Sequence, residues 1–428
     1  MVGGGQNGNK KKKKRGGCGR RKMTAEQAQA LRDVNEWVYS EKRGCDESAS
    51  DDDDDFRGFL PRVMRDPRVS DQRVSFELHC HSIFSDGFLS PKALVEKAHQ
   101  NGVKVLALTD HDTMAGIPEV QEAAQRYGIK VIPGVEISTI FSLEDDPASE
   151  EPVHILAYYS SCGPSRYEKV EKFLANIRDG RFVRAKNMVS KLNILKVPVK
   201  WERVMKIAGS GTAPGRLHVA RALVEAGYVT NLKQAFARYL YDDGPAYSRG
   251  SEPSAEEAVR LICDTGGLAV LAHPWSLKNP ALIVRYLKEA GLHGIETYRG
   301  DGKLSAYSDL ADAYGLVKLG GSDYHGRGGN HESLLGSVTL PVLEVDEFLK
   351  LARPIWCNAI RNILERYAED PSVSNLENIT RFEKTRITKG TCGKDLINTC
   401  LSLWLTREEV QTPEFQVTMS KLSLVAAN

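Results

Sequence analysis

The spacing of hydrophobic and polar positions changes several times along the chain. Between residues 74 and 160, short apolar runs such as VKVLALTDHD and IKVIPGVEIST alternate with helical stretches such as SPKALVEKAHQNG. Strands that alternate with helices of this length indicate βα units, and therefore a parallel sheet or a barrel. Ser90 and Pro91 form a helix start, and Gly102 and Gly128 follow expected helix ends. The pattern predicts an α/β domain.

The strand pattern is interrupted between about residues 165 and 265. Five segments there have helical spacing of apolar residues, with Gly, Pro or Asn between them. Strand-like runs then return as GLAVLAHP, GLHGIETY, LVKLGGSDYH and GSVTLP. We therefore expect one α/β domain in two parts, residues 73–164 and 266–345, split by an all-helical insertion at 165–265.

The two ends of the chain depart from this pattern. Residues 1–72 hold the basic run NKKKKKRGGCGRRK, a helical candidate TAEQAQALRDVNEWVYSEK and the acidic block DESASDDDDD. Such charge blocks favour a mostly disordered tail, with the central helix at most docking on the main body. The basic cluster Lys10 to Lys22 fits a nuclear import signal, a polyanion contact or a merely solvated tail.

Residues 346–428 form a helical C-terminal extension. We expect VDEFLKLARPIWCNAIRNILERYAED to break at Pro354, and a second helical stretch to follow as GKDLINTCLSLWLTREEV. Both stretches could pack on the barrel, and Trp404 with its leucines could equally form a face for a partner.

Composition narrows the class of protein. The 428 residues are 41% hydrophobic, which is ample for a large core, and the net charge of +2 is too small to indicate nucleic-acid binding by itself. Eight cysteines without a CxxC pair indicate reduced thiols. No apolar stretch approaches the roughly 20 residues that span a bilayer, and the N-terminus lacks the apolar core of a signal peptide. We expect an intracellular protein, cytoplasmic or nuclear, without membrane contact.

The stretch FELHCHSIFSDG carries the first candidate chemistry. In a strand, alternation points His79 and His81 to one face and Cys80 to the other, so the two imidazoles can converge on one point. A pair of this kind suits a metal ion. Taken alone, however, it fits two ordinary half-buried histidines equally well.

The remaining histidines and carboxylates favour the metal interpretation. Six histidines fall at or just past the end of a predicted strand, and three carboxylates occupy matching places: His79, His81, His111, His154, His273, His325, Asp86, Glu136 and Asp323. In a β/α barrel such positions converge on one mouth. Imidazole and carboxylate ligands suit Zn, Mn or Fe(II) rather than Ca or Mg. Nine ligands exceed the needs of one or two ions, so we expect three divalent ions.

Six motifs in fixed order give a family resemblance. HCHSIFSDG, ALTDHDT, PGVEIS, HILAY, LAHP and GSDYHG resemble the successive motifs of the PHP (polymerase and histidinol phosphatase) metallo-phosphoesterases, over residues 74 to 340. The resemblance implies a distorted (β/α)7 barrel. It also implies three ligand groups: His79, His81, Glu136 and Asp323; Glu136, His154 and His273; and Asp86, His111 and His325. Asp110 and Asp112 are expected to orient the His111 imidazole.

The insertion points to one branch of that family. IRDGRFVRAKNMVSKL and GRLHVARALVEAGYV are similar to the helical insert of bacterial PHP enzymes that remove the 3'-phosphate of nucleoside 3',5'-bisphosphates and trim short RNA from its 5' end. The resemblance implies a metal-dependent phosphoric-ester hydrolase in which the insertion caps the substrate. Asp323 and His325 would be catalytic, and His325 or water would protonate the departing oxygen.

Basic residues of the insertion are candidates for binding the substrate. Arg178, Arg181 and Arg184 are three apart and form a cationic stripe on one helical face, which suits phosphate oxygens. Arg216 and His218 fall at a predicted helix start, where free backbone N–H groups also favour an anion. A solvated helix face is the alternative interpretation.

Two other functions remain open from the sequence. One is a phosphatase of another small metabolite, such as histidinol phosphate. The other is a non-catalytic scaffold whose charged tail binds nucleic acid. Loss of ligands would mark the scaffold, whereas all nine candidate ligands are present.

Overall fold

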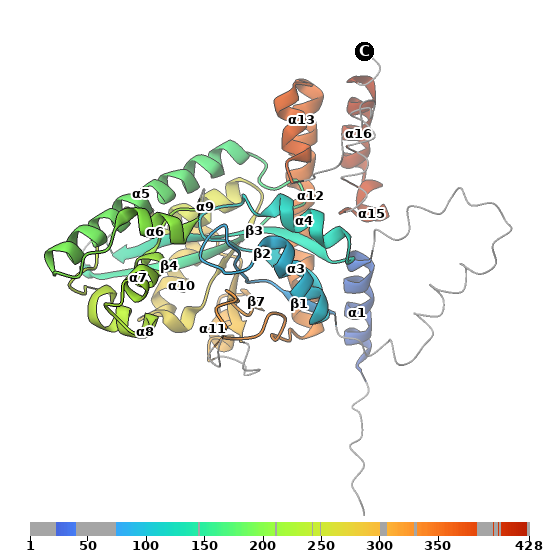
Figure 1. Ribbon diagram of the computed structural model, residues 1–428. Helices are drawn as coiled ribbons and strands as arrows, with labels where there is room; N and C mark the ends of the chain where they lie inside the picture. Colours follow the sequence, from blue (N-terminus) through green and yellow to red (C-terminus); the bar gives the residue numbers. More distant parts are fainter. Residues whose placement is uncertain are drawn as a thin grey trace, which may run out of the picture.

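The computed structural model is shown in Figure 1. It describes residues 23–39, 74–143, 146–209, 212–241, 243–248, 250–299, 306–328, 332–382, 397, 401 and 404–425. The basic cluster Lys10 to Lys22 and the acidic block of the N-terminal region lie outside the described residues. None of the helices in the described part of the chain combines the length and hydropathy that a membrane-spanning segment requires.

Seven strands form one mixed sheet in the order β1 to β7. Their bounds are β1 Ser75–Glu77, β2 Val103–Leu108, β3 Lys130–Leu143, β4 Asp146–Tyr158, β5 Leu268–Leu271, β6 Gly294–Tyr298 and β7 Val317–Gly320. The prediction of an α/β fold is confirmed. Among the described residues, the two edge strands form no ladder with each other, but an isolated parallel bridge joins Cys80 and Tyr324 just beyond them.

Strand β4 runs against the rest of the sheet. It is antiparallel to both β3 and β5, whereas the other neighbouring strands are parallel. The expectation of parallel βα units is wrong here, because only residues 144–145 separate β3 from β4. A parallel crossover needs a dozen or more residues, so the two long strands pair as a hairpin.

Two other predicted elements differ from the structure. GSVTLP does not form a strand. Helix α12 (Val342–Glu369) continues through Pro354, where we expected a break. Buried side chains on both sides of the proline, Phe348 and Trp356 among them, pack on the same core. Their burial offsets the roughly 3 kcal/mol that an interior proline costs.

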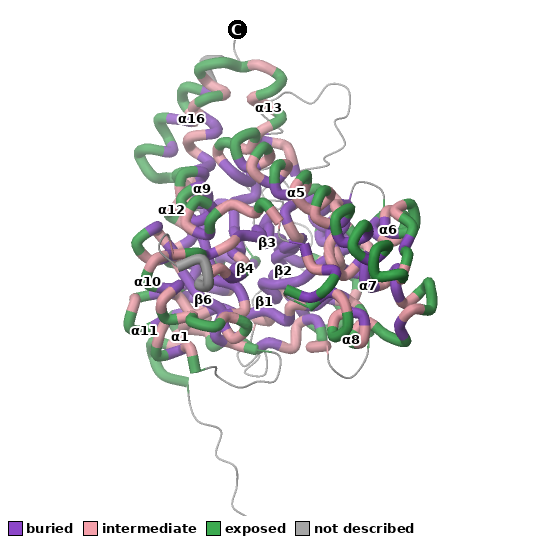
Figure 2. Tube along the Cα trace, turned by 90° about the vertical axis from the view of Figure 1, so that its left-hand side faces the viewer, coloured by how far each residue is buried: buried purple, intermediate pink, exposed green. Residues whose placement is uncertain are grey.

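The sheet lies between two apolar cores, one on each of its faces. On its outer face, Leu106 and Val131 join the core formed with α3 (Pro91–Gln100), α4 (Ile117–Gln125), α9 (Ala255–Asp264), α10 (Pro280–Ala290) and α11 (Ser308–Ala313). The alternate residues Val105 and Ile132 point to the inner face and join a second core. Figure 2 shows the strands as the buried centre of the molecule.

The second core closes one end of the inner face, and we call it the floor. It includes side chains of α1 (Ala25–Val38), α12 and α16 (Pro413–Val425), which stand together in Figure 1. Trp37, Trp356 and Trp404 meet there with ring centroids 5.3 to 6.3 Å apart. Lys130 Nζ donates to the backbone oxygen of Trp37 at 2.6 Å. The helical candidate of the N-terminal region therefore docks on the main body. Short helices α13 (Val373–Thr380) and α15 (Arg407–Val410) complete this end.

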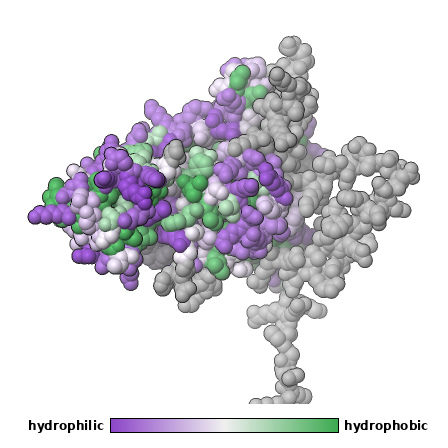
Figure 3. Space-filling view, viewed as in Figure 1, coloured by the Kyte–Doolittle hydropathy of each residue, from purple (hydrophilic) through white to green (hydrophobic). Residues whose placement is uncertain are grey.

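The predicted helical insertion lies at the opposite side of the molecule in Figure 1. It contains α5 (Tyr167–Ile194), α6 (Trp201–Ala208), α7 (Arg216–Glu225), α8 (Leu232–Ala235) and a π-helical turn (Phe236–Leu240). A separate apolar core runs from Ala185 to Ala246, whereas α9 and the first half of α5 pack on the outer layer of the sheet. Hydrophilic and hydrophobic side chains are interspersed over the surface of these helices in Figure 3.

Candidate metal centre

Along the inner face of β2 and β3, apolar side chains at one end are followed by ionisable side chains at the other. On β2 and the residues after it, the inner positions run from Val105 through Ala107 to His111. On β3 they run from Ile132 to Glu136. Because side chains on one face recur every two residues, the same face that builds the floor carries ionisable groups at its other end. We call that end the rim.

Glu136 is the centre of the rim. Its side chain is 1% exposed. Five histidine rings approach its two carboxylate oxygens at 2.8 to 3.4 Å: His79, His81, His111, His154 and His273. These side chains come from β3, β4 and the segments after β1, β2 and β5, so the sheet brings together residues up to 194 positions apart, from 79 to 273.

Two aspartates connect the remaining predicted ligands. Asp323 Oδ1 lies 3.4 Å from His79 Nε2 and 3.2 Å from His81 Nε2. Asp86 Oδ1 lies 3.1 Å from His325 Nε2 and 3.9 Å from His111 Nε2. All nine side chains expected from the sequence therefore form one continuous cluster, which we call the rim cluster.

The rim cluster contains three groups whose ligand atoms lie within 4.8 Å of one another. They are His79, His81, Glu136 and Asp323; His111, Glu136 and His154; and His81, Asp86, His111 and His325. The first has the composition expected from the sequence. The second has His111 where we expected His273, although His273 Nε2 is 3.0 Å from Glu136 Oε1.

Atoms without a well-formed hydrogen bond in the rim cluster fit bound cations. In the described structure His81 Nδ1, Asp86 Oδ1 and His111 Nδ1 are buried and form no such bond, and each lies 3.1 to 4.0 Å from an ionisable group of the cluster itself. Buried polar atoms are normally satisfied, and ring nitrogens and carboxylate oxygens without a partner are what a divalent transition metal takes as ligands. The donor set is therefore able to hold metal ions.

Hydrogen bonds behind two histidines determine which nitrogen faces the cluster. His79 Nδ1 lies 3.1 Å from Glu296 Oε1, and His325 Nδ1 lies 2.8 Å from the carbonyl oxygen of Asp323. Both partners can only accept, so both Nδ1 atoms carry the proton in the neutral ring. Nε2 then offers its lone pair to the cluster, as in a metal ligand oriented from behind.

Charge within the rim cluster shifts the pKa values of its members. Burial alone would raise the pKa of the Glu136 carboxyl, but His111, His79 and His154 hold it well below its usual range. Burial opposes protonation of His81, whereas hydrogen bonds to Asp323 and Glu136 raise the pKa of His81 to about 10. Carboxylates and imidazoles thus neutralise one another in the absence of ions.

His154 reaches the rim by a different route from the one expected. It lies inside β4, opposite Ser138 of β3, and not at the carboxyl end of a strand. Because β4 is antiparallel, the earlier part of the strand meets the carboxyl ends of its neighbours. The sequence therefore predicted His154 at the rim on the incorrect assumption that β4 runs parallel to its neighbours.

The expected role of Asp110 and Asp112 is wrong. In the described structure Asp110 accepts hydrogen bonds from the Ser82 backbone and from the hydroxyls of Ser82 and Ser85 at 2.6 to 2.7 Å. It thereby fixes the loop that carries Asp86. Asp112 accepts from the Ser138 backbone at 2.7 Å and pairs with Arg181 at 2.6 Å. Neither carboxylate has a hydrogen bond to the His111 ring among these contacts.

Sequence reasoning missed two buried glutamates. Glu296 of β6 holds the His79 ring and accepts from the His273 backbone N–H at 2.7 Å. Glu77 of β1 accepts from the backbone N–H groups of His79, Ser322 and Gly336 at 2.7 to 3.2 Å, and thereby ties the two edge strands together. A carboxylate inside an apolar strand is rare, and that was the available signal.

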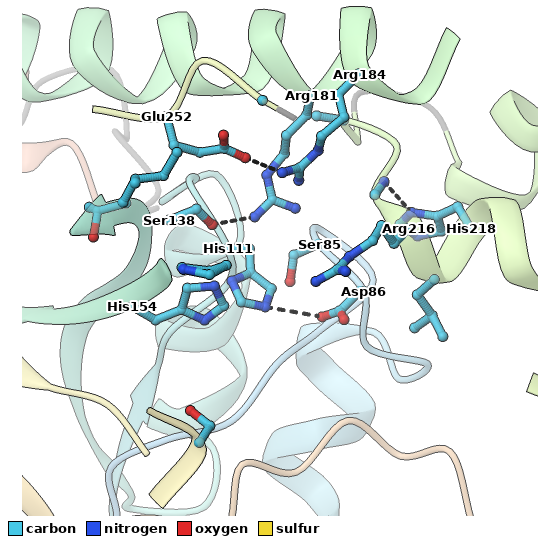
Figure 4. A pocket seen from close by; sticks show the side chains of 18 of the residues that line it. Ser85, Asp86, His111, Ser138, His154, Arg181, Arg184, Arg216, His218 and Glu252 are labelled. Atoms are coloured by element: carbon cyan, nitrogen blue, oxygen red, sulfur yellow. Dashed lines mark hydrogen bonds and ion pairs between the residues drawn. The ribbon is translucent and has the colours of Figure 1, made fainter. Parts of the chain in front are cut away.

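A cavity of about 520 Å³ lies between the rim cluster and the insertion. Figure 4 shows Arg181 and Arg184 reaching down from α5 towards His111 and His154. Arg181 also donates to the Ser138 hydroxyl, and its buried Nε has no partner in the described structure. The cavity therefore has candidate metal ligands on one wall and guanidinium groups on the other.

Some of these basic groups also have structural partners. Arg184 pairs with the buried carboxylate of Glu252. The Arg178 side chain donates to the backbone oxygen of Asp112 at 2.8 Å. Arg178 thus links the insertion to the segment after β2, whereas Arg184 links α5 to the segment before α9 within the insertion. Arg178 and Arg184 both line the cavity.

Arg216 and His218 lie in the first turn of α7 and line the same cavity (Figure 4). The Arg216 guanidinium stands 5.5 Å from the Tyr247 ring centroid. His218 Nδ1 accepts from the Gly215 backbone N–H at 2.9 Å, and burial lowers the pKa of His218 to about 4. The imidazole is thus neutral at neutral pH, with its proton on Nε2, and it caps the helix.

Comparison with known proteins gives a matching family model and several named relatives. The PHP domain model matches residues 77–191. The chain is 31% identical over 290 residues to the 3',5'-nucleoside bisphosphate phosphatase of Chromobacterium violaceum, a match that covers 66% of this chain and 95% of that protein. It is 35% identical over 264 residues to the 5'-3' exoribonuclease of Haemophilus influenzae, with 58% and 89% covered.

A third relative and one crystal structure agree with this assignment. The phosphoribosyl 1,2-cyclic phosphate 1,2-diphosphodiesterase of Eggerthella lenta is 33% identical over 257 residues, with 59% of this chain and 95% of that protein covered. A Bifidobacterium adolescentis structure with a provisional assignment as a metal-dependent phosphoesterase matches at a TM-score of 0.56 and 31% identity. That match covers 65% of this chain and 96% of the other. The chain belongs to the PHP domain family and is a metal-dependent phosphoric-ester hydrolase.

Proposed function

We propose that the protein removes the 3'-phosphate of nucleoside 3',5'-bisphosphates and trims short RNA from its 5' end. One observation carries the proposal: a single cavity has the rim cluster on one wall and the basic groups Arg181, Arg184 and Arg216 on another. A substrate with two phosphates would meet both walls at once. The relative from Chromobacterium violaceum, named for this activity, supports the choice.

The rim cluster would hold three divalent ions, Zn, Mn or Fe, at the carboxyl end of a distorted (β/α)7 barrel. Its three ligand groups share Glu136, His81 and His111, which suits neighbouring ions with common ligands. When bound, such ions lower the pKa of water and neutralise charge on a phosphoryl group. The insertion at 165–265 would act as the cap that excludes bulk water.

Protein groups at the rim would then handle protons. Asp323 is the most exposed of the nine ligands, at 45%, and although burial raises its pKa, His79, His81 and His325 hold that pKa well below its usual range. Its carboxylate is therefore ionised and would face the attacking water as the group that takes its proton. The His325 Nδ1 proton is committed to the Asp323 carbonyl oxygen. A neutral His325 cannot also donate from Nε2, which favours a ligand role for His325 over protonation of the leaving oxygen.

The second phosphate would bind at the insertion. Arg181, Arg184 and Arg216 present planar donors that suit phosphate oxygens, and neutral His218 can add one donor at Nε2. Binding energy from a remote phosphate can be used to orient the reacting one. A substrate with one phosphate would lose that contribution.

Phosphate release by the metal-loaded protein tests the proposal. We expect adenosine 3',5'-bisphosphate to be hydrolysed with a kcat/KM at least about tenfold above that for histidinol phosphate or a ribose cyclic phosphate. The cyclic ester must be included because the relative from Eggerthella lenta is named for such a substrate. A preference for either competitor would reject the proposed substrate and leave the phosphoesterase assignment intact. Absence of turnover of all three substrates would favour the scaffold alternative.

A further inference from the structure

Trp275 is a large aromatic side chain without a place in the cores. The chain has five tryptophans. Trp37, Trp356 and Trp404 belong to the floor, and Trp201 packs on the core of the insertion. Trp275 is partly exposed and is absent from all three apolar cores of the described residues. Burial of apolar surface therefore does not explain its presence.

The backbone holds Trp275 beside the rim cluster. It follows the ligand candidate His273, whose φ of 28° lies in the region that non-glycine residues avoid. The next residues form a short 3-10 turn (Pro274–Ser276). Ser276 Oγ donates to the His273 carbonyl oxygen at 2.8 Å and lies 3.1 Å from His273 Nδ1. The indole ring centroid is thereby held 6.4 Å from that of the His273 ring.

A guanidinium group covers the indole ring. Arg299, which follows β6 and is exposed, has its Cζ 4.6 Å from the Trp275 ring centroid. Ser276 and Lys278, on the same segment as Trp275, line the cavity, whereas Trp275 itself is outside the residues that line it. The aromatic and cationic pair therefore lies at the edge of the cavity, next to the metal ligands and outside the capped space.

We propose that Trp275 and Arg299 form a stacking platform for the second nucleotide of a single-stranded oligoribonucleotide. This inference rests on the proposed function. The first nucleoside would occupy the cavity under the insertion, and its 3'-linked phosphate would lie at the rim cluster. The next nucleotide must then leave the cavity at its edge. A partly exposed indole with a guanidinium over its ring suits stacking with a base of any sequence, and Lys278 suits the following phosphate.

The platform predicts a substrate-selective loss. Trp275→Ala and Arg299→Ala are compared with wild type on adenosine 3',5'-bisphosphate, which has one base, and on a 5'-phosphorylated tetraadenylate. We expect kcat/KM for the tetranucleotide to fall at least about tenfold more than kcat/KM for the bisphosphate. Trp275→Phe, which keeps an aromatic face, should recover most of the loss.

Arg285→Ala is the matched control. Arg285 is exposed and lies 5.2 Å from the Tyr286 ring, so it has the same type of contact on α10. This variant should not change the ratio of the two substrates. Equal losses on both substrates in Trp275→Ala, or a change in Arg285→Ala as large as in Arg299→Ala, would overturn the platform.

Binding without metal separates this inference from the proposed function. Fluorescence anisotropy of a labelled tetraadenylate, measured in the presence of a chelator, should report affinity at least about tenfold weaker for Trp275→Ala than for Trp275→Phe. If the wild type fails to hydrolyse bisphosphate, the proposed function fails, and this measurement still decides on the platform. Equal affinity of the alanine and phenylalanine variants would reject it.

Discussion

The rim and the floor are opposite ends of the same inner sheet face, and their physical chemistry differs. At the floor, Trp356 is fully buried, contacts two other tryptophans and donates from Nε1 to the Tyr158 carbonyl oxygen at 3.1 Å. At the rim, the described residues include buried nitrogens and oxygens without a well-formed hydrogen bond, and Asp323 has a φ of 51°. Stability is thus concentrated at one end, and strain with unsatisfied ligands at the other.

Variants of the rim ligands are expected to show the largest difference between their effect on activity and their effect on stability. His79→Ala and His81→Ala should lower phosphate release roughly a thousandfold or more, because His79 belongs to one ligand group and His81 to two. The variants should still unfold cooperatively, since neither histidine belongs to an apolar core of the described residues. Both are measured on the same preparations, by phosphate release and by urea unfolding.

Cys80→Ser is the control for those variants. Cys80 lies between the two histidines, is fully buried in the outer core and donates from Sγ to the Ala107 carbonyl oxygen. It should keep most of the activity. A loss in Cys80→Ser as large as in the histidine variants would contradict the alternation of side chains across the chain.

At the floor the opposite result is expected. Trp356→Ala should lower the free energy of unfolding by about 3–5 kcal/mol, through lost apolar contacts and an unmade hydrogen bond. The kcat of the molecules that remain folded should stay within a factor of two or three. Trp356→Phe should cost less. A large fall in kcat with unchanged stability would show that the floor takes part in the chemistry.

The insertion should affect substrate choice more than stability. Arg216→Ala should lower kcat/KM for adenosine 3',5'-bisphosphate by about 10- to 100-fold, and much less for an aryl phosphate that has only the reacting group. Arg203→Ala, on α6 and outside the cavity, is the control. Parallel losses on both substrates would mean that Arg216 serves the reacting phosphate. Arg184→Ala is less informative, because it leaves the Glu252 carboxylate unpaired.

The smallest effects are expected from the N-terminal region. Removing residues 1–22 should leave turnover of the bisphosphate and the unfolding free energy unchanged. Removing residues 1–70 should lower stability, because the deletion takes Trp37 out of the floor. A fall in bisphosphate turnover after the shorter deletion would contradict a separate role for the tail. If the basic run contacts RNA, the slope of log affinity against log salt should fall by about 0.7 per lost contact.

The sequence predicted the residues of the rim better than their surroundings. His79 could be found because local spacing places it just past the end of β1. Glu136 was also found, although it lies inside β3 and not at the strand end that the sequence indicated. The direction of β4, and with it the position of His154, depends on a tight connection between β3 and β4 that periodicity does not reveal. Glu296 and Asp110 act through hydrogen bonds to residues distant in sequence, so only the folded chain identifies them. Continuity of α12 through Pro354 likewise depends on tertiary packing.

Metal content measured together with phosphate release tests the central claim most directly. Wild type and Glu136→Gln are loaded with Mn, Zn or Fe(II), dialysed, and analysed for bound ions per chain and for hydrolysis of adenosine 3',5'-bisphosphate. We predict three ions per chain in the wild type, and activity that is removed by chelation and restored by one of these metals. In Glu136→Gln we predict a loss of bound ions together with a loss of activity, since Glu136 belongs to two of the three ligand groups. Full activity after chelation, or wild-type ion content in an inactive Glu136→Gln, would contradict the account.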